Sequence, residues 1–122
     1  MHCNDRNALG RAGEDAAASY LTSAGWRILA RNVRRREGEV DIVARRDDTL
    51  AFVEVKTRRS TAFGTPGEAV TIRKQRRIRM LAASLLAEGI GRAPLIRFDV
   101  IEARPCRCAP GCFTVNHIQD AF

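Results

Sequence analysis

The sequence lacks a long hydrophobic run. Its longest near-apolar stretch, residues 80–87, falls well short of the roughly 18 apolar residues that a membrane-spanning helix needs. The first residues, 1–5, contain no signal-peptide core. The chain also has no internal repeat, low-complexity segment or linker. We therefore expect a cytoplasmic protein without a membrane partner.

Cysteine is scarce as well. Cys3, Cys106, Cys108 and Cys112 are too few and too clustered for a disulfide framework, so we expect reduced thiols. The last three, together with His117, could supply the four zinc ligands of a zinc-stabilised adaptor. However, the single residue between Cys106 and Cys108 is a shorter gap than zinc knuckles use. We favour a hairpin loop with incidental thiols.

Lysine is rarer still. Only two of the 21 basic residues are lysines, in a chain with 14 acidic residues and a net charge of +7. Arginine is thus the ordinary positive charge here, which makes the positions of Lys56 and Lys74 informative. A basic chain suits a polyanion, and we favour nucleic acid because no segment combines a basic face with an aromatic-rich apolar one. A merely soluble basic protein is the alternative that composition leaves open.

Hydrophobic periodicity and turn residues predict one domain over residues 1–122, with 45% hydrophobic residues to build its core. The predicted elements are a helix from Asn4 or Asp5 to Gly25, strands at 26–32, 40–44 and 50–56, a helix at 71–88, and strands at 95–103 and 113–118. A loop containing Gly64, Pro66 and Gly67 precedes the second helix. This αβββαββ order predicts an α/β fold, with an antiparallel meander, a parallel crossover and a mixed central sheet flanked by helices.

The helices have recognisable inner faces. The expected buried positions are Leu9, Ala12, Ala16 and Tyr20 in the first helix, and Ile78, Leu81, Ala82 and Leu85 in the second. Lys74 shares the second face, so its amine is expected to point inward, although a snorkelling lysine is the alternative. Glu14 shares its angular position with small and apolar residues and can reach the sheet, unless it is simply a solvated glutamate.

Two predicted strands bring charged residues together. Alternation groups Glu54 and Lys56 with Leu50 and Phe52 on one face of the strand at 50–56. In the strand at 40–44, it groups Glu39, Asp41 and Val43 against Val40, Ile42 and Ala44. A turn at residues 46–49 would set Asp41 opposite Glu54, and Glu39 opposite Lys56.

Like charges on directly opposed side chains, with Cβ atoms about 5 Å apart, destabilise a sheet. A hard divalent cation shared by Asp41 and Glu54 would remove that repulsion, and Mg²⁺ uses such carboxylates together with waters and substrate phosphates. Lys56 could then orient or help deprotonate a water, which an arginine could not do as well. The alternative is an ordinary solvated strand end with surface ion pairs.

Glu14, Asp41 and the run Glu54-Val55-Lys56 resemble the PD-(D/E)xK nuclease superfamily, within it the archaeal-type Holliday junction resolvases, and more closely the YraN-type bacterial family of predicted endonucleases. The matching phrases are Gly10-x-x-Gly13-Glu14, Gly38-Glu39-Val40-Asp41-Ile42-Val43-Ala44, Phe52-Val53-Glu54-Val55-Lys56-Thr57-Arg58, Lys74, Arg97-Phe98-Asp99-Val100 and Ala121-Phe122. The resemblance covers nearly the whole chain and implies a restriction-endonuclease-like core.

The resemblance also implies roles for the site residues. Asp41 and Glu54 would hold one or two Mg²⁺ or Mn²⁺ ions, Glu14 would complete the metal shell directly or through water, and Lys56 would assist the attacking water. Lys74 would meet phosphate or an active-site acid. Val40 stands where the superfamily name has proline, a position that shapes the backbone and supplies no ligand. Glu39 would tune Lys56 or support one of the other site residues.

We therefore expect a metal-dependent endonuclease that hydrolyses phosphodiester bonds by metal-activated water. DNA, including branched DNA, is the expected substrate, although nothing in the sequence separates DNA from RNA or a monomer from a homodimer. Arg58, Arg73, Arg77 and Gln75 are the expected nucleic-acid contacts, within a wider arginine-rich rim. The alternative function is a non-catalytic nucleic-acid-binding accessory protein that retains the nuclease fold.

Overall fold

The structure is a computed structural model that describes residues 5–59, 70–108 and 111–122. Its elements are α1 (Asp5–Ser23), β1 (Arg27–Arg35), β2 (Gly38–Arg46), β3 (Thr49–Thr57), α2 (Ile72–Ala87), β4 (Leu95–Pro105) and β5 (Phe113–Ile118). The predicted order is confirmed. The first four strands extend beyond their predicted bounds, because the added end residues continue the hydrogen-bonded ladders of the sheet.

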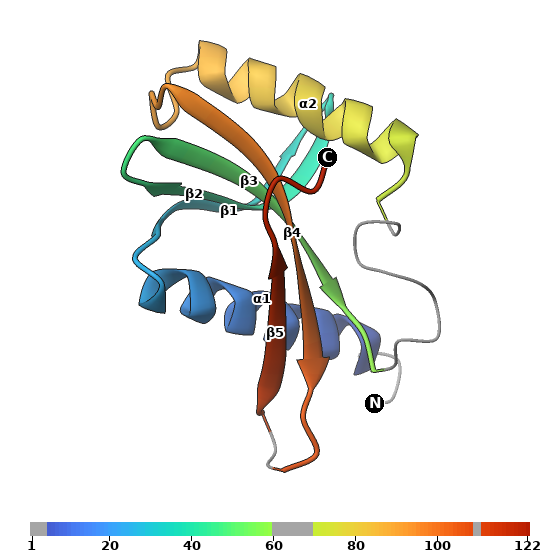
Figure 1. Cartoon of the computed structure of the whole chain (residues 1–122). Coiled ribbons are helices and arrows are strands. Elements are labelled where there is room, and N and C mark those ends of the chain that lie inside the picture. The colour runs from blue at the N-terminus through green and yellow to red at the C-terminus, as the bar shows by residue number, and fades with distance from the viewer. Residues whose placement is uncertain (1–4, 60–69, 109–110) are drawn as a thin grey trace.

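The five strands form one mixed sheet in the order β1-β2-β3-β4-β5 (Figure 1). β1, β2 and β3 are the predicted antiparallel meander, and β5 runs antiparallel to β4. β3 and β4 are parallel, because α2 carries the chain back along the sheet between them. The predicted α/β fold with a mixed central sheet is thus confirmed.

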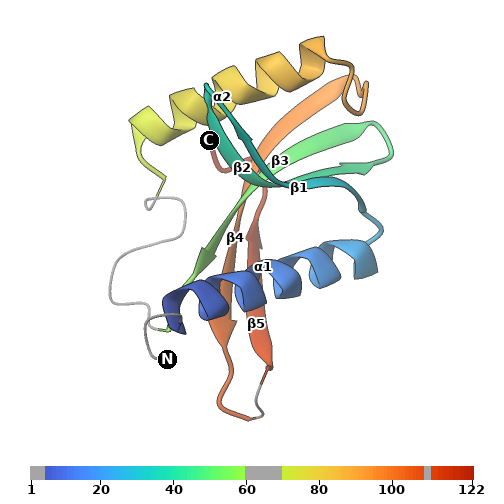
Figure 2. The ribbon, with the colours of Figure 1, turned by 180° about the vertical axis from the view of Figure 1, so that it is seen from behind.

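The two helices cover opposite faces of the sheet (Figures 1 and 2). Each face has its own apolar cluster. The α2 cluster includes Val43, Phe52, Phe98 and Val100, and the α1 cluster includes Ile42, Val53, Val55 and Ile101. Because β3 contributes alternate residues to the two clusters, both of its faces are buried, as in other central strands of α/β sheets.

The inner face of α1 differs from the predicted one. The buried positions are Gly13, Ala17 and Leu21, whereas Ala16 and Tyr20 are only half-buried. The reason is a close approach between the helix and β3. A Cβ atom at Gly13 would lie 2.0 Å from the Thr57 hydroxyl oxygen, so only glycine lets α1 pack this closely. Packing along Gly13 turns the inner face around the helix and leaves the neighbouring Glu14 half-buried.

The inner face of α2 is the predicted one, since Ile78, Leu81, Ala82 and Leu85 are its buried residues. The helix begins after Thr71, whose hydroxyl accepts a hydrogen bond from the backbone N–H of Lys74 at 3.2 Å. This cap fixes the first turn, and therefore the starting point of the Lys74 side chain.

Strand alternation breaks within β2. Val40 and Val43 both pack in the α2 cluster, whereas Ile42 packs in the α1 cluster. In a regular strand Val40 and Ile42 would share a face, so the predicted grouping is wrong at Val40. On the neighbouring strand, Asn32 has a left-handed φ of 52°, which marks an irregularity at the same level. Asp41 therefore lies where the pleat of β2 changes.

The expectation of reduced thiols is also wrong, because Cys106 and Cys112 form a disulfide across the base of the β4–β5 loop. His117 does not join the cysteines. Its ring contacts the Tyr20 hydroxyl at 3.1 Å and the Asp99 carboxylate at 2.7 Å. The alternative of four zinc ligands that include His117 is therefore not assembled.

Several predictions lie outside the described residues, namely the cap at Asn4, the loop with Gly64, Pro66 and Gly67, and Cys3. Neither of the two helices in the described ranges has the length and apolar character that crossing a membrane requires.

Candidate active site

The acidic residues of β2 and β3 meet where the ladder between the strands ends. The ladder has the predicted register from Arg46↔Thr49 to Ile42↔Val53. Beyond it, the Asp41 carboxylate accepts the backbone N–H of Val55 through Oδ2 at 2.7 Å. The side chain of Asp41 thus takes the place of a main-chain partner and is held beside Glu54.

Glu54 is a buried carboxylate with two lysine partners. It is 4% exposed, which excludes the solvated strand end that the sequence left open. Its Oε1 atom lies 2.5 Å from the Lys74 amine and 3.4 Å from the Lys56 amine. The amine of Lys74 therefore points inward as predicted. Both lysines of the chain converge on this one carboxylate.

The two lysines differ electrostatically. Burial lowers the pKa of Lys56, and the nearby charge of Lys74 lowers it further, against the opposing effect of Glu54. Burial also disfavours the charge on Lys74, but the hydrogen bond and charge of Glu54 outweigh it and raise the pKa of Lys74. Lys74 is thus the fixed counter-ion of Glu54, and Lys56 is the amine that gives up a proton more readily.

Asp41 is crowded by negative charge. The pKa of Asp41 is raised to about 7, chiefly by burial and also by the charges of Glu54 and Glu14. The Val55 amide and the Lys74 charge oppose this shift without cancelling it. Asp41 and Glu54 are therefore close enough to repel each other.

Glu14 is near this group without completing it. It projects half-buried from α1, and its charge acts on Asp41. Within the described ranges, however, the one set of three or more potential metal-ligand atoms within 4.8 Å of one another is made of cysteines. The carboxylate oxygens of Glu14, Asp41 and Glu54 are therefore not all within 4.8 Å of one another. Glu14 would act on a shared cation through a water molecule.

Sequence reasoning missed a further acid beside this group. Glu102 of β4 is the register partner of Lys56, it is 3% exposed, and it pairs with Arg104. Parallel register partners project from the same face of a sheet, so Glu102 lies alongside Lys56. Only the parallel pairing of β3 with β4 reveals this neighbour, and spacing within one strand could not.

Glu39 is not where the hairpin arithmetic placed it. Because the β2–β3 ladder stops at Ile42, Glu39 has no position opposite Lys56. It is instead the register partner of Arg34 on β1, and its carboxylate lies 3.1 Å from the Arg34 guanidinium. The expected tuning of Lys56 by Glu39 is therefore wrong.

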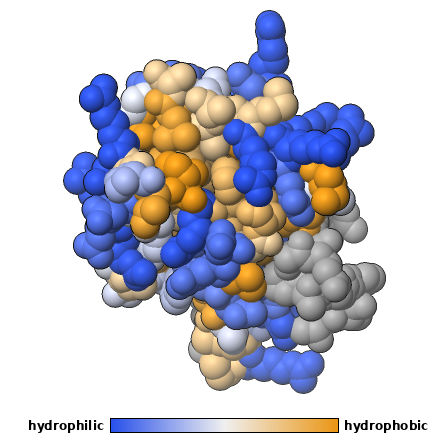
Figure 3. All heavy atoms as spheres, turned by 45° about the horizontal axis from the view of Figure 1, so that its top comes forward, coloured by the Kyte–Doolittle hydropathy of each residue, from blue (hydrophilic) through white to orange (hydrophobic). Residues whose placement is uncertain are grey.

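A basic cavity of about 520 Å³ adjoins the acidic residues. We call it the arginine pocket. Its charged lining residues are Arg34, Arg35, Glu39, Arg73, Lys74 and Arg77. Lys74 belongs both to this pocket and to the Glu54 cluster, so the two features are continuous. Hydrophilic side chains also project from much of the face seen in Figure 3.

The residues expected to contact nucleic acid differ in their positions. Arg73 and Arg77 line the arginine pocket. Arg58 follows β3 directly, and its backbone N–H donates to Ala103 at 3.0 Å. The Gln75 side chain instead donates to the Val70 carbonyl at 2.9 Å, which fixes the entry to α2.

The donor chemistry of this site fits a hard divalent cation. Asp41 and Glu54 offer carboxylate oxygens, the ligands that Mg²⁺ and Mn²⁺ prefer. Among the described residues, neither Oδ1 of Asp41 nor Oε2 of Glu54 accepts a hydrogen bond. A shared cation would also offset the repulsion that raises the pKa of Asp41.

Comparison with known proteins places the chain in a family. Residues 13–103 match the uncharacterised protein family UPF0102, and this span contains Glu14, Asp41, Glu54, Lys56 and Lys74. A UPF0102 protein of Symbiobacterium thermophilum is 56% identical over 114 residues, which cover 93% of this chain and 95% of the relative. A UPF0102 protein of Frankia casuarinae is 49% identical over 118 residues, which cover 96% and 98%. The chain therefore belongs to UPF0102, the YraN-like family.

Proposed function

We propose that this protein is a metal-dependent nuclease of the PD-(D/E)xK superfamily that hydrolyses phosphodiester bonds, with DNA as the expected substrate. The observation that carries the proposal is the convergence of both lysines of the chain on Glu54, next to Asp41. In a chain whose other 19 basic residues are arginines, two lysines on one buried carboxylate favour a chemical role over a merely structural one.

Asp41 and Glu54 would hold the cation, with Glu14 acting through water. A hard divalent ion bound there supplies positive charge for the phosphate and lowers the pKa of a water. Lys56, whose pKa is already lowered, can orient the attacking water or accept its proton. Lys74 holds the Glu54 carboxylate in place and keeps its own charge toward the substrate phosphate.

The arginine pocket supports a nucleic acid as the substrate. Arg34, Arg73 and Arg77 line it, and Lys74 connects it to the acids. A guanidinium group can donate two hydrogen bonds to the oxygens of one phosphate, and such contacts do not depend on the base sequence. We therefore infer that the pocket binds the backbone next to the scissile bond. Because phosphate contacts release counterions, binding should weaken steeply with salt.

The direct test is cleavage by the purified protein. Duplex, branched and single-stranded DNA, and matched RNA, would be incubated with Mg²⁺, with Mn²⁺, or with a chelator. We expect cleavage that requires the divalent cation. Asp41→Asn should lower kcat/KM by at least about a hundredfold. Lys56→Ala should do the same while leaving nucleic-acid affinity within about twofold, because a proton-transfer group contributes to the reaction step.

Two controls sharpen this test. Asp15→Asn removes an exposed acid of α1 that pairs with Arg31 at 2.8 Å, and it should leave cleavage unchanged. Lys56→Arg keeps the positive charge but cannot give up a proton, so its failure to restore activity would separate proton transfer from charge. Cleavage that survives in both Asp41→Asn and Lys56→Ala would come from a contaminating nuclease and would contradict the proposal.

A readout that does not depend on activity is Mn²⁺ binding. A crystal soaked with Mn²⁺ should show anomalous density between Asp41 and Glu54, and Asp41→Asn should abolish it. Density elsewhere, with none between the two carboxylates, would contradict the assignment of the metal ligands.

One observation favours a second function, a non-catalytic nucleic-acid-binding accessory protein. Glu54 is already neutralised by two amines, as in a stable ion-pair cluster that needs no cation. In that case the protein binds nucleic acid through the arginine pocket, no divalent cation induces cleavage, and Lys56→Ala changes only stability. The cleavage panel above distinguishes the two functions.

A further inference from the structure

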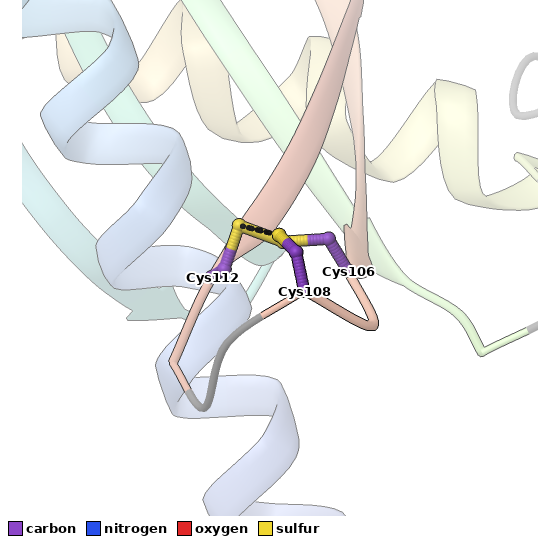
Figure 4. Close-up of a disulfide and its surroundings, with 3 residues drawn as sticks. All are labelled: Cys106, Cys108 and Cys112. Carbon is purple, nitrogen blue, oxygen red and sulfur yellow. Dashed lines mark hydrogen bonds between the residues drawn. A yellow bond between two sulfur atoms is a disulfide. The ribbon is translucent and has the colours of Figure 1, made fainter.

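A second cluster of reactive side chains lies at the tip of the β4–β5 hairpin, away from α2 (Figure 1). Cys106 follows β4 directly, Cys112 precedes β5, and Cys108 lies in the loop between them. The N–H of Cys106 donates to the carbonyl of Cys112 at 2.9 Å, which holds the two ends of the loop together. The three sulfur atoms turn toward one another in Figure 4.

The sulfur atoms are close enough to share one ion. Cys108 Sγ lies 3.3 Å from Cys106 Sγ and 3.5 Å from Cys112 Sγ, and all three lie within 4.8 Å of one another. A Zn–S bond length of about 2.3 Å places sulfur atoms about 3.8 Å apart around a tetrahedral ion. The distances from Cys108 are within about half an ångström of that value.

The cysteine cluster is open to solvent and offers three protein ligands. Cys108 is exposed at the hairpin tip, so exchange with solvent ions is unobstructed. His117 is occupied by Tyr20 and Asp99, which leaves three protein ligands and one position for solvent.

We propose that the reduced hairpin binds a thiophilic cation such as Zn²⁺ through the thiolates of Cys106, Cys108 and Cys112. The disulfide between Cys106 and Cys112 is the metal-free, oxidised form of the same loop. A phosphine or dithiol reductant gives two electrons to the S–S bond, and two protons from solvent complete the two thiols. Binding of Zn²⁺ then displaces the three thiol protons. This site is independent of the proposed nuclease function.

The test uses the full-length protein, reduced with a phosphine and titrated with Co²⁺ and with Zn²⁺. We expect one Co²⁺ per chain with strong thiolate-to-cobalt charge-transfer absorption, which Zn²⁺ displaces. This absorption cannot come from the carboxylate site, because Asp41 and Glu54 offer no sulfur. The oxidised protein should give none of it.

Matched variants assign the ligands. Cys108→Ser removes an exposed sulfur and should weaken Zn²⁺ binding by more than about a hundredfold, beyond the loss expected for an outer partner. Cys3→Ser removes the remaining cysteine of the chain and should leave binding unchanged. Far-UV circular dichroism would check that both variants fold.

A second measurement covers the case in which Cys108→Ser does not fold. Zn²⁺ should protect Cys106, Cys108 and Cys112 of the reduced wild-type protein from alkylation, as read by mass spectrometry. The proposal is overturned if reduced wild-type protein shows no thiolate–cobalt absorption, if Cys108→Ser binds Zn²⁺ as tightly as wild type, or if Zn²⁺ leaves these thiols unprotected.

Discussion

Asp99 is buried and Asp41 is half-buried on the same sheet, and their surroundings differ in kind. Asp99 is fully buried, and both of its oxygens are used, because Arg97 donates to them at 2.9 Å each, His117 lies at 2.7 Å and the Asp120 amide donates at 2.9 Å. Burial would raise the pKa of Asp99, but these partners outweigh it and hold the pKa below its usual value.

Asp41 has the opposite balance. Burial and two neighbouring acids outweigh the one backbone amide that donates to it, so its pKa is raised to about 7. A carboxylate whose oxygens are all satisfied stabilises the fold, whereas one left among like charges lowers the stability of the fold, and a bound cation can offset that loss. Asp99 is thus a structural acid, and Asp41 is the candidate functional one.

The largest effect is expected at Asp99. Asp99→Asn removes the counter-charge of Arg97 and the partner of His117 inside the protein. Breaking a buried ion pair in this way costs about 3–5 kcal/mol of unfolding free energy, which urea denaturation would measure. Asp15→Asn is the matched control, since the Arg31–Asp15 pair is exposed and should contribute less than about 1 kcal/mol. Equal losses in the two variants would contradict the structural role of Asp99.

At Asp41, a substitution is expected to raise the unfolding free energy rather than lower it. Asp41→Asn keeps an oxygen that can accept the Val55 N–H but removes a negative charge beside Glu54. At pH 8 in a chelator, the variant should be more stable than wild type by about 1–3 kcal/mol, because the ionised acid is destabilising there. The same variant should lose cleavage. A less stable Asp41→Asn would show that this acid resembles Asp99.

The pH dependence of the unfolding free energy should also distinguish Asp99 from Asp41. The folded-state pKa of Asp99 is lowered, so its contribution is present above the ordinary value of 3.8 and is lost as pH falls through the folded pKa. The folded-state pKa of Asp41 is raised, so wild-type stability should fall as pH rises from 3.8 to about 7. Asp99→Asn should flatten the acid limb, and Asp41→Asn the neutral limb, of unfolding free energy measured by urea denaturation across this pH range. Unchanged limbs would contradict these assignments.

Much of the fold and part of the candidate site could be predicted from the sequence. Turn residues and alternation gave the strand order, and the hairpin register followed from one turn position. The helix between β3 and β4 allowed a parallel crossover, and the two strands are indeed parallel. Glu54, Lys56 and Lys74 were predicted to face inward because each shares a face with apolar residues, and their burial and contacts agree with this.

The remainder depends on features that one strand or helix does not encode. The change of pleat at Asp41 lies at the level of Asn32, which has a left-handed φ, and the pairing of Glu39 with Arg34 follows from the β1–β2 register. Glu102 becomes a neighbour of Lys56 only through the parallel register. The convergence of the cysteines requires the β4–β5 register, in which Pro105 pairs with Phe113 at the base of the loop.

The smallest effect on stability is expected at Glu39, which is more exposed than Asp99 and Asp41. Its pair with Arg34 has side chains that are 57% and 80% exposed, so Glu39→Gln should change unfolding free energy by less than about 0.5 kcal/mol. Nucleic-acid affinity should nevertheless rise a few-fold at low salt, because the change removes the acid that lines the arginine pocket and frees Arg34 for phosphate.

The salt dependence of binding shows whether that gain comes from the backbone. With Arg34 released, the slope of log K against log salt should become steeper by up to about one phosphate contact. Arg34→Gln is the matched opposite change and should make the slope shallower by a similar amount. If Glu39→Gln tightens binding without changing the slope, the arginine pocket does not contact phosphate, and the nucleic acid must bind to another part of the protein.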